Sequence, residues 1–155
     1  MLQTLKDLFD SLQPPKAGDS QRHAEHALQL ATAVLLVEVM RADASFDPAE
    51  SEAVLSALQA KFALSRDESE RLMELAHRAS RDSTDHYTFT SRINQAFSME
   101  QKVRMVEFMW RVAYADGTLA AHENHLMRKM ADLLHVPHGA YVHAKMRARE
   151  VSGNA

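Results

Sequence analysis

Apolar residues recur with the helical period of 3.6 residues along nearly the whole chain, and no stretch alternates apolar and polar residues for long enough to make a strand. This periodicity predicts an all-α protein. It predicts a compact bundle of about seven or eight helices. They are expected over about 2–12, 20–41, 48–62, 65–81, 86–96, 98–112, 120–134 and 137–149.

Capping patterns mark where several of these helices begin. Each pattern has a serine or aspartate that can accept a bond from a backbone N–H, followed three residues later by a glutamate or glutamine. The patterns are Asp47–Pro48–Ala49–Glu50, Ser65–Arg66–Asp67–Glu68 and Ser98–Met99–Glu100–Gln101, and Ser20 is expected to cap the second helix. Two helices, over about 27–39 and 103–112, are apolar on most faces, so we expect them at the centre of the bundle.

Length and composition exclude several classes of protein. The 155 residues, 46% of them hydrophobic, are enough for one domain with a sizeable core. The absence of cysteine excludes disulfides, zinc–cysteine sites, iron–sulfur clusters and thiol nucleophiles. No apolar run reaches the roughly 20 residues of a membrane helix and no signal-peptide pattern is present, so the cytoplasm is the expected location. A net charge of −3 gives no general electrostatic reason to bind nucleic acid.

The first 19 residues are expected to form an amphipathic helix and a proline-rich linker outside a domain that spans 20–150, with a disordered tail over 151–155. Leu2, Leu5, Leu8, Phe9 and Leu12 make one apolar stripe on this helix. The stripe must be covered by the domain, by a second copy in a homo-oligomer, or by a membrane surface to which the chain attaches peripherally. We expect docking on the domain first.

An internal repeat relates the two halves of the chain. A shift of 73 residues places 42–46 on 115–119 and Glu50 on Glu123. The same shift places apolar positions 30, 35, 36 and 39 on apolar positions 103, 108, 109 and 112. Each copy therefore predicts a buried helix, a short acidic turn and a second helix. Two such copies predict a pseudo-two-fold arrangement in which the buried helices pack centrally.

These motifs resemble those of the tellurite-resistance TerB family, whose domain is related to the amino-terminal region of DjlA-type co-chaperones. The likeness covers about residues 24–149. It rests on Arg41–Ala42–Asp43 with Phe46–Asp47 and Glu50, on Tyr114–Ala115–Asp116–Gly117 with Glu123, and on Leu134–His135–Val136–Pro137. The resemblance implies an all-helical fold, no established catalytic activity, a bacterial stress or tellurite-resistance setting, and a divalent-metal site made by acidic residues. Ala44 departs from the glycine of the family motif.

Asp43, Glu50, Asp116 and Glu123 are the candidate metal ligands, because two Asp-x6-Glu units offer hard oxygen ligands suited to Ca²⁺ or Mg²⁺. Local capping is the alternative, since Asp43 and Asp116 lie where a helix ends and Glu50 completes a capping box with Asp47. Glu123 has no such capping partner. We therefore expect Asp116 and Glu123 to form the more competent site.

Other site chemistries have weaker support in the sequence. Histidines three residues apart can place two imidazoles on one helix face for a transition metal. Such pairs are His23/His26, His122/His125 and His135/His138. No Gly-x-Ser-x-Gly motif and no phosphate-binding glycine loop occurs, which makes an undetected hydrolase the least favoured class. The methionines lie mostly at apolar helix positions and are interpreted as core, with a peptide-binding groove as the alternative.

The sequence thus predicts a non-enzymatic TerB-like stress module that binds a divalent metal through its acidic turns and recruits a protein partner. The alternative is a metal-independent protein-interaction adaptor. Charge differs between the halves: residues 38–74 carry 9 acids and 4 bases, a net of −5, whereas 100–150 carry 6 acids and 8 bases, a net of +2. We expect the acidic half to attract a basic partner or a cation, with solvated helix faces as the alternative.

Overall fold

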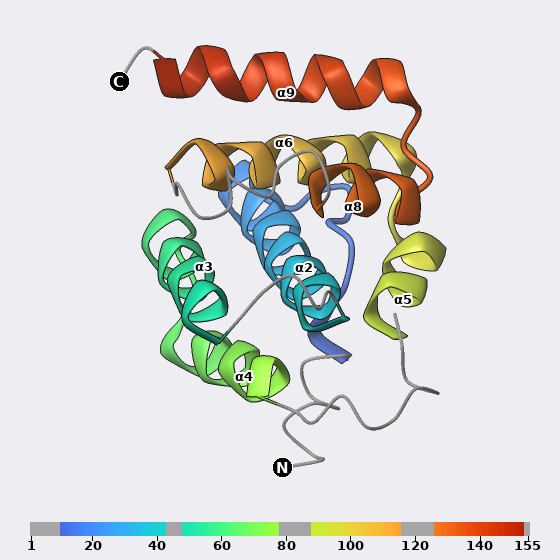
Figure 1. Cartoon of the computed structure of the whole chain (residues 1–155). Coiled ribbons are helices and arrows are strands. Elements are labelled where there is room, and N and C mark those ends of the chain that lie inside the picture. Colours follow the sequence, from blue (N-terminus) through green and yellow to red (C-terminus); the bar gives the residue numbers. More distant parts are fainter. Residues whose placement is uncertain (1–9, 43–47, 78–87, 116–125, 154–155) are drawn as a thin grey trace.

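The computed structural model describes residues 10–42, 48–77, 88–115 and 126–153. This described part contains seven α-helices and no strand, which confirms the all-α prediction. The helices are α2 (Gln21–Ala42), α3 (Pro48–Lys61), α4 (Arg66–His77), α5 (Thr88–Ala96), α6 (Met99–Ala115), α8 (Arg128–Leu133) and α9 (His138–Gly153) (Figure 1). No helix in these four ranges is both long enough and apolar enough to span a membrane.

Reciprocal capping boxes begin two of the helices at the predicted places. Before α4, the Ser65 N–H donates to Glu68 Oε1 at 2.8 Å, and the Glu68 N–H donates to Ser65 Oγ at 3.1 Å. Ser98 and Gln101 make the same two bonds before α6, at 2.8 and 3.2 Å. These bonds satisfy backbone N–H groups that a helix leaves without an internal partner, so the sequence locally determines where both helices start.

The two central helices are the ones whose apolar residues cover most faces. α2 and α6 cross in the middle of the molecule, α9 lies along the outer side of α6, and α4 packs on α2 at the opposite side (Figure 1). Every side chain from residue 30 to residue 40 of α2 is buried, as is every side chain from 105 to 110 of α6. The order α9, α6, α2, α4 therefore forms a stack with the core around its two inner helices.

The structure extends the repeat to a third helix. α2, α3 and α4 correspond in order to α6, α8 and α9, and each outer helix packs on its own central helix. The second helices reach across to the other unit, since α3 contacts α6 as well as α2, and α8 contacts α2. Phe62, directly after α3, packs edge-on against Phe108 of α6, with the ring centroids 5.9 Å apart. This reciprocal packing is the pattern that a pseudo-two-fold relation between two units produces.

A Schellman motif ends α8 and explains the sequence that follows it. His135 adopts the left-handed conformation, with φ at 61°. Its N–H donates to the Asp132 carbonyl at 3.0 Å, and the Val136 N–H donates to the Ala131 carbonyl at 2.9 Å. Val136 is buried against the core. The two bonds satisfy the last carbonyls of α8 and turn the chain towards α9.

Both ends of the described chain belong to the folded domain. Leu12, the last member of the predicted amino-terminal stripe, is 1% exposed and lies in the core. Its carbonyl accepts a bond from Arg92 Nε of α5 at 3.3 Å. The other members of the stripe lie outside the described residues. At the far end, α9 runs to Gly153, so residues 151–153, which the sequence assigned to a disordered tail, are helical.

Candidate functional site

Of the four predicted metal ligands, the structure describes Glu50 alone. Glu50 lies in the first turn of α3 and is partly buried. Asp43, Asp116 and Glu123 lie outside the described residues. Within the described ranges, no group of three or more histidine, aspartate or glutamate side chains is arranged to hold a metal ion. The acidic metal site therefore stays a prediction.

The helices around the two acidic segments occupy equivalent places in the repeat. One segment follows α2 and precedes α3, and the other follows α6 and precedes Leu126 and Met127, a short π-helical stretch that leads into α8. Met127 and Leu126 are fully buried. Both acidic segments thus connect a buried central helix to a second helix that packs on the opposite central helix.

Glu38 of α2 is a buried carboxylate that the sequence analysis did not single out as a site residue. It is 4% exposed and receives three hydrogen bonds from the start of α5. The Phe89 N–H donates to Oε2 at 3.0 Å, while the Thr90 N–H and hydroxyl donate to Oε1 at 2.8 and 2.7 Å. Glu38 therefore caps α5 from another helix and places a negative charge at its positive end.

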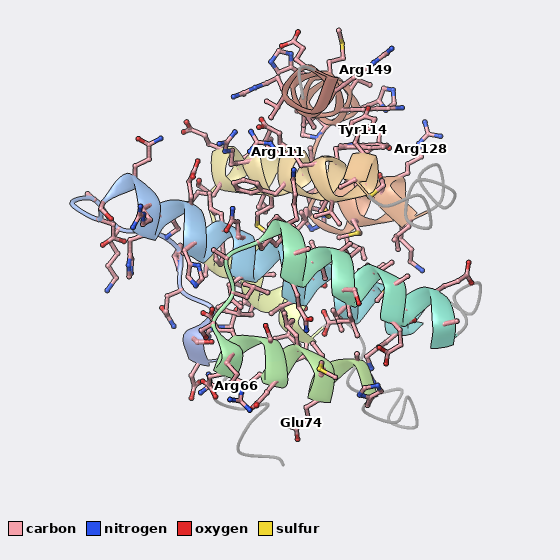
Figure 2. All side chains as sticks on the ribbon, turned by 90° about the vertical axis from the view of Figure 1, so that its left-hand side faces the viewer. Arg66, Glu74, Arg111, Tyr114, Arg128 and Arg149 are labelled. Atoms are coloured by element: carbon pink, nitrogen blue, oxygen red, sulfur yellow. The ribbon has the colours of Figure 1, made fainter. Side chains whose placement is uncertain are left out.

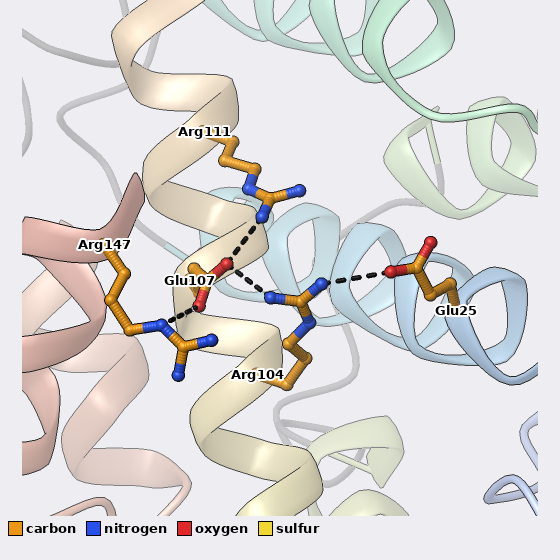
Figure 3. Close-up of polar contacts among 5 residues, drawn as sticks. All are labelled: Glu25, Arg104, Glu107, Arg111 and Arg147. Carbon is orange, nitrogen blue, oxygen red and sulfur yellow. Dashed lines mark hydrogen bonds and ion pairs between the residues drawn. The ribbon is translucent and has the colours of Figure 1, made fainter. Parts of the chain in front are cut away.

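Glu107 of α6 is the second buried carboxylate, and three arginines surround it (Figure 3). Its side chain is 3% exposed. Oε2 accepts from Arg104 and, at 2.6 Å, from Arg111, one turn to either side on α6. Oε1 pairs with Arg147 Nε of α9 at 3.2 Å. The carboxylate therefore fastens α9 to α6 and offsets the charge of neighbouring guanidinium groups.

The arginines of this cluster reach further into the molecule. Arg104 also donates to Glu25 of α2 at 3.0 Å, so one chain of ion pairs links α2, α6 and α9 (Figure 3). The guanidinium carbons of Arg104 and Arg111 lie 4.8 and 5.3 Å from the centroid of the Phe108 ring. These cation–π contacts hold both arginine side chains along α6.

His26 and Glu68 join α2 to α4. His26 Nε2 lies 3.0 Å from each carboxylate oxygen of Glu68, the same residue that completes the capping box with Ser65. Burial alone would raise the pKa of Glu68, but the Ser65 backbone hydrogen bond and the His26 contact outweigh it. The pKa of Glu68 consequently lies below its ordinary value of 4.5, so its ionised form stabilises the fold.

Lys102 is a buried cation at the junction of α5, α6 and α8. It is 6% exposed, and its Nζ donates to Asn94 Oδ1 at 3.2 Å. Asn94 in turn donates through Nδ2 to the Leu133 carbonyl at 2.7 Å. Burial lowers the pKa of Lys102, because the charged amine loses hydration. Lys102 and Asn94 therefore link α6 to α5 and α8 by hydrogen bonds, and we assign them a structural role.

The predicted histidine pairs do not converge on one site in the described ranges. His26 pairs with Glu68, whereas His23 is exposed on the first turn of α2 and its N–H donates to the Ser20 cap at 3.1 Å. His135 forms the left-handed turn after α8, and the His138 ring stacks on Tyr141 at 5.9 Å between centroids. His122 and His125 lie outside the described residues.

The sequence does contain a signal for Glu38 and Glu107, the two buried carboxylates that were not predicted. Glu38 interrupts the longest apolar run of the chain, and Glu107 lies inside the most apolar part of α6 with arginines three residues before it and four residues after it. An acid on an otherwise buried helix requires a partner, because an unpaired buried charge is costly. The pattern shows that partners exist, but not that they come from α5 and α9.

Comparison with known proteins supports one family. The sequence profile described as "Tellurite resistance protein TerB" matches residues 29–146, a span that runs from α2 to α9 and includes both acidic segments. No curated protein and no solved structure gave a match. The family match covers well over half of the chain and includes every motif on which the resemblance rests. The chain therefore belongs to the TerB tellurite-resistance family.

Proposed function

We propose that this chain is a non-enzymatic TerB-family module of a tellurite-resistance or stress response, and that its acidic segments bind a divalent cation and so regulate recruitment of a protein partner. The supporting observation is the reciprocal packing of the two repeat units. It gives the two acidic segments, Asp43 to Glu50 and Asp116 to Glu123, equivalent connections between a central helix and the helix packed on the opposite one. The family match spans both segments.

The residue chemistry favours a hard cation. Aspartate and glutamate oxygens suit Ca²⁺ and Mg²⁺, and the chain has no cysteine to favour a softer metal. Glu50 lies at the amino-terminal end of α3, where the helix dipole already stabilises a carboxylate. Glu123 has no capping partner in the sequence pattern. The second segment, with Asp116 and Glu123, is therefore the stronger half of the proposed site.

A metal-independent adaptor is the second candidate, and a specific observation favours it. Glu38, Glu68 and Glu107 are buried or partly buried acids, and each is satisfied by hydrogen bonds or ion pairs with protein groups. This fold thus uses acids to join helices. If the acids of the two acidic segments follow the same rule, they stabilise the fold, and the partner binds without metal.

Calorimetric titration separates the two candidates. Chelator-stripped protein is titrated with Ca²⁺, Mg²⁺, Mn²⁺ and Zn²⁺, and the proposal expects saturable binding of a hard cation together with a rise in melting temperature. The absence of any binding heat and of any shift in melting temperature with all four ions would favour the adaptor.

Paired substitutions locate the site. Asp116→Asn with Glu123→Gln should abolish the metal-dependent rise in melting temperature and leave the helical circular dichroism intact. The matched control is Asp132→Asn with Glu150→Gln, which makes the same chemical changes at exposed positions of α8 and α9. A metal response that survives in the Asp116/Glu123 variant would exclude this pair as ligands.

A further inference from the structure

The two outer helices of the stack are equivalent in the repeat but opposite in charge. α4 carries four acids (Asp67, Glu68, Glu70, Glu74) and two arginines (Arg66, Arg71), a net of −2. α9 carries three bases (Lys145, Arg147, Arg149) and one acid (Glu150), a net of +2. Figure 2 shows Glu74 and Arg149 pointing away from the molecule at opposite edges. Glu68 and Arg147 are paired within the molecule, with His26 and Glu107. The remaining charges leave a net of −1 on α4 and +1 on α9, and Glu74 and Arg149 point to solvent on opposite sides.

Each outer helix also exposes apolar side chains among its charges. On α4, Met73 is 38% exposed and lies next to Glu74. On α9, Val142 is 38% exposed and Met146 is 57% exposed, one turn apart. α9 turns Ala144 and Ala148 towards the core, so Val142 and Met146 lie on its outer side. An apolar centre with a charged rim is the make-up of a protein–protein interface.

We propose that the outer face of α9 in one copy of this chain docks on the outer face of α4 in a second copy. The two faces are complementary, because Val142 and Met146 share the outer side of α9 with exposed Arg149, whereas Met73 lies on α4 with Glu70 and Glu74. One chain carries both faces. α4 and α9 lie on opposite sides of one molecule, so they cannot satisfy each other within it (Figure 1). The contact is head-to-tail, with two different surfaces, and leaves an α4 and an α9 free for further copies.

Sedimentation velocity tests the contact in the full-length chain, over a concentration range from about 10 µM to about 1 mM. At low ionic strength, the average mass should rise with concentration above the 17.4 kDa of one chain. At 1 M salt, where the screening length falls to about 3 Å, it should return towards 17.4 kDa. A mass that stays at one chain at all concentrations and salt levels would overturn the proposal.

Charge reversal identifies the surfaces. Glu70→Lys with Glu74→Lys changes the net charge of α4 from −2 to +2, and His143→Glu with Arg149→Glu changes that of α9 from +2 to −1. Each variant alone should weaken association at least about tenfold. An equimolar mixture should restore it, because the unchanged α4 of one variant then faces the unchanged α9 of the other, and the two reversed helices also carry opposite charges.

The controls reverse exposed charges on other helices, with Arg22→Glu on α2 and Glu100→Lys on α6. Both should associate as the unchanged chain does. Met73→Ser should weaken association without abolishing its salt dependence, since it removes the apolar centre and keeps the charges. Association that is unchanged in both reversed variants, or that is not restored by mixing them, would show that α4 and α9 are not the contact.

Discussion

At the scale of single residues, Glu38 makes the sharpest prediction about stability. Its buried carboxylate accepts three bonds from the first residues of α5, so Glu38→Ala removes the acceptor of three buried hydrogen bonds. We expect the free energy of unfolding to fall by about 2–4 kcal/mol, and by less in Glu38→Gln, which keeps one acceptor. Urea denaturation measures both. Glu100→Ala on the exposed start of α6 is the control, and a loss for Glu38→Ala as small as the control's would contradict the assigned role.

Glu68 predicts a pH dependence whose sign follows from its lowered pKa. A carboxyl with a lower pKa in the folded state contributes stability that is complete above its unfolded pKa, about 4.5, and is lost as the pH falls through the folded value. The stability difference between the unchanged chain and Glu68→Gln should therefore shrink as the pH falls below about 4.5. Denaturation at a series of pH values measures it.

The second capping box supplies the control for this prediction. Gln101 occupies the place of Glu68 and has no charge to titrate. Gln101→Ala should lower stability by about 1 kcal/mol, equally at all these pH values. A Glu68→Gln difference that stays constant with pH would mean that the carboxylate charge adds nothing to the box.

At the scale of elements, the ion pair between Arg147 of α9 and Glu107 of α6 attaches α9, and the two residues contribute unequally to stability. Arg147→Met leaves Glu107 paired with Arg104 and Arg111, and Arg147 is half-exposed, so the expected loss is about 1 kcal/mol or less. Glu107→Met leaves three guanidinium groups around an apolar side chain, and the expected loss is about 3–5 kcal/mol. Denaturant unfolding compares them, with Arg149→Met as the exposed control. Equal losses would show that Glu107 does not hold the cluster together.

Sequence alone predicted the features that depend on near neighbours. Each capping box joins two residues that lie three apart, Ser65 with Glu68 and Ser98 with Gln101. Local geometry therefore determines these caps, and the caps determine where the two helices start. The partners of Glu38 and Glu107 lie on other helices, and they depend on how α2 and α6 cross, which the period of a single helix does not contain. The predicted metal site has the same dependence on how the helices pack, because two of its four ligands come from each repeat unit.

At the scale of the whole molecule, the contacts of each second helix with the central helix of the other unit predict that neither repeat unit folds alone. α3 packs on α6 and α8 packs on α2, so a cut between residues 78 and 87 separates each second helix from the central helix of the other unit. It also exposes the buried faces of α2 and α6 along their crossing. Fragments 1–82 and 83–155 should each show weak helical circular dichroism and no cooperative melting.

Mixing the two fragments should restore helicity and a cooperative transition, because the contacts between α2 and α6 can then form in trans. Leu35→Ala in the first fragment tests the contact between α2 and α6, since Leu35 is fully buried on α2. Arg22→Ala is the control, because it changes an exposed residue of the same helix. The first substitution should weaken complementation strongly and the second should not. A single fragment that melts cooperatively as a monomer would contradict the prediction. It would mean that each unit has its own core, and that the crossing of α2 and α6 joins two units that fold independently.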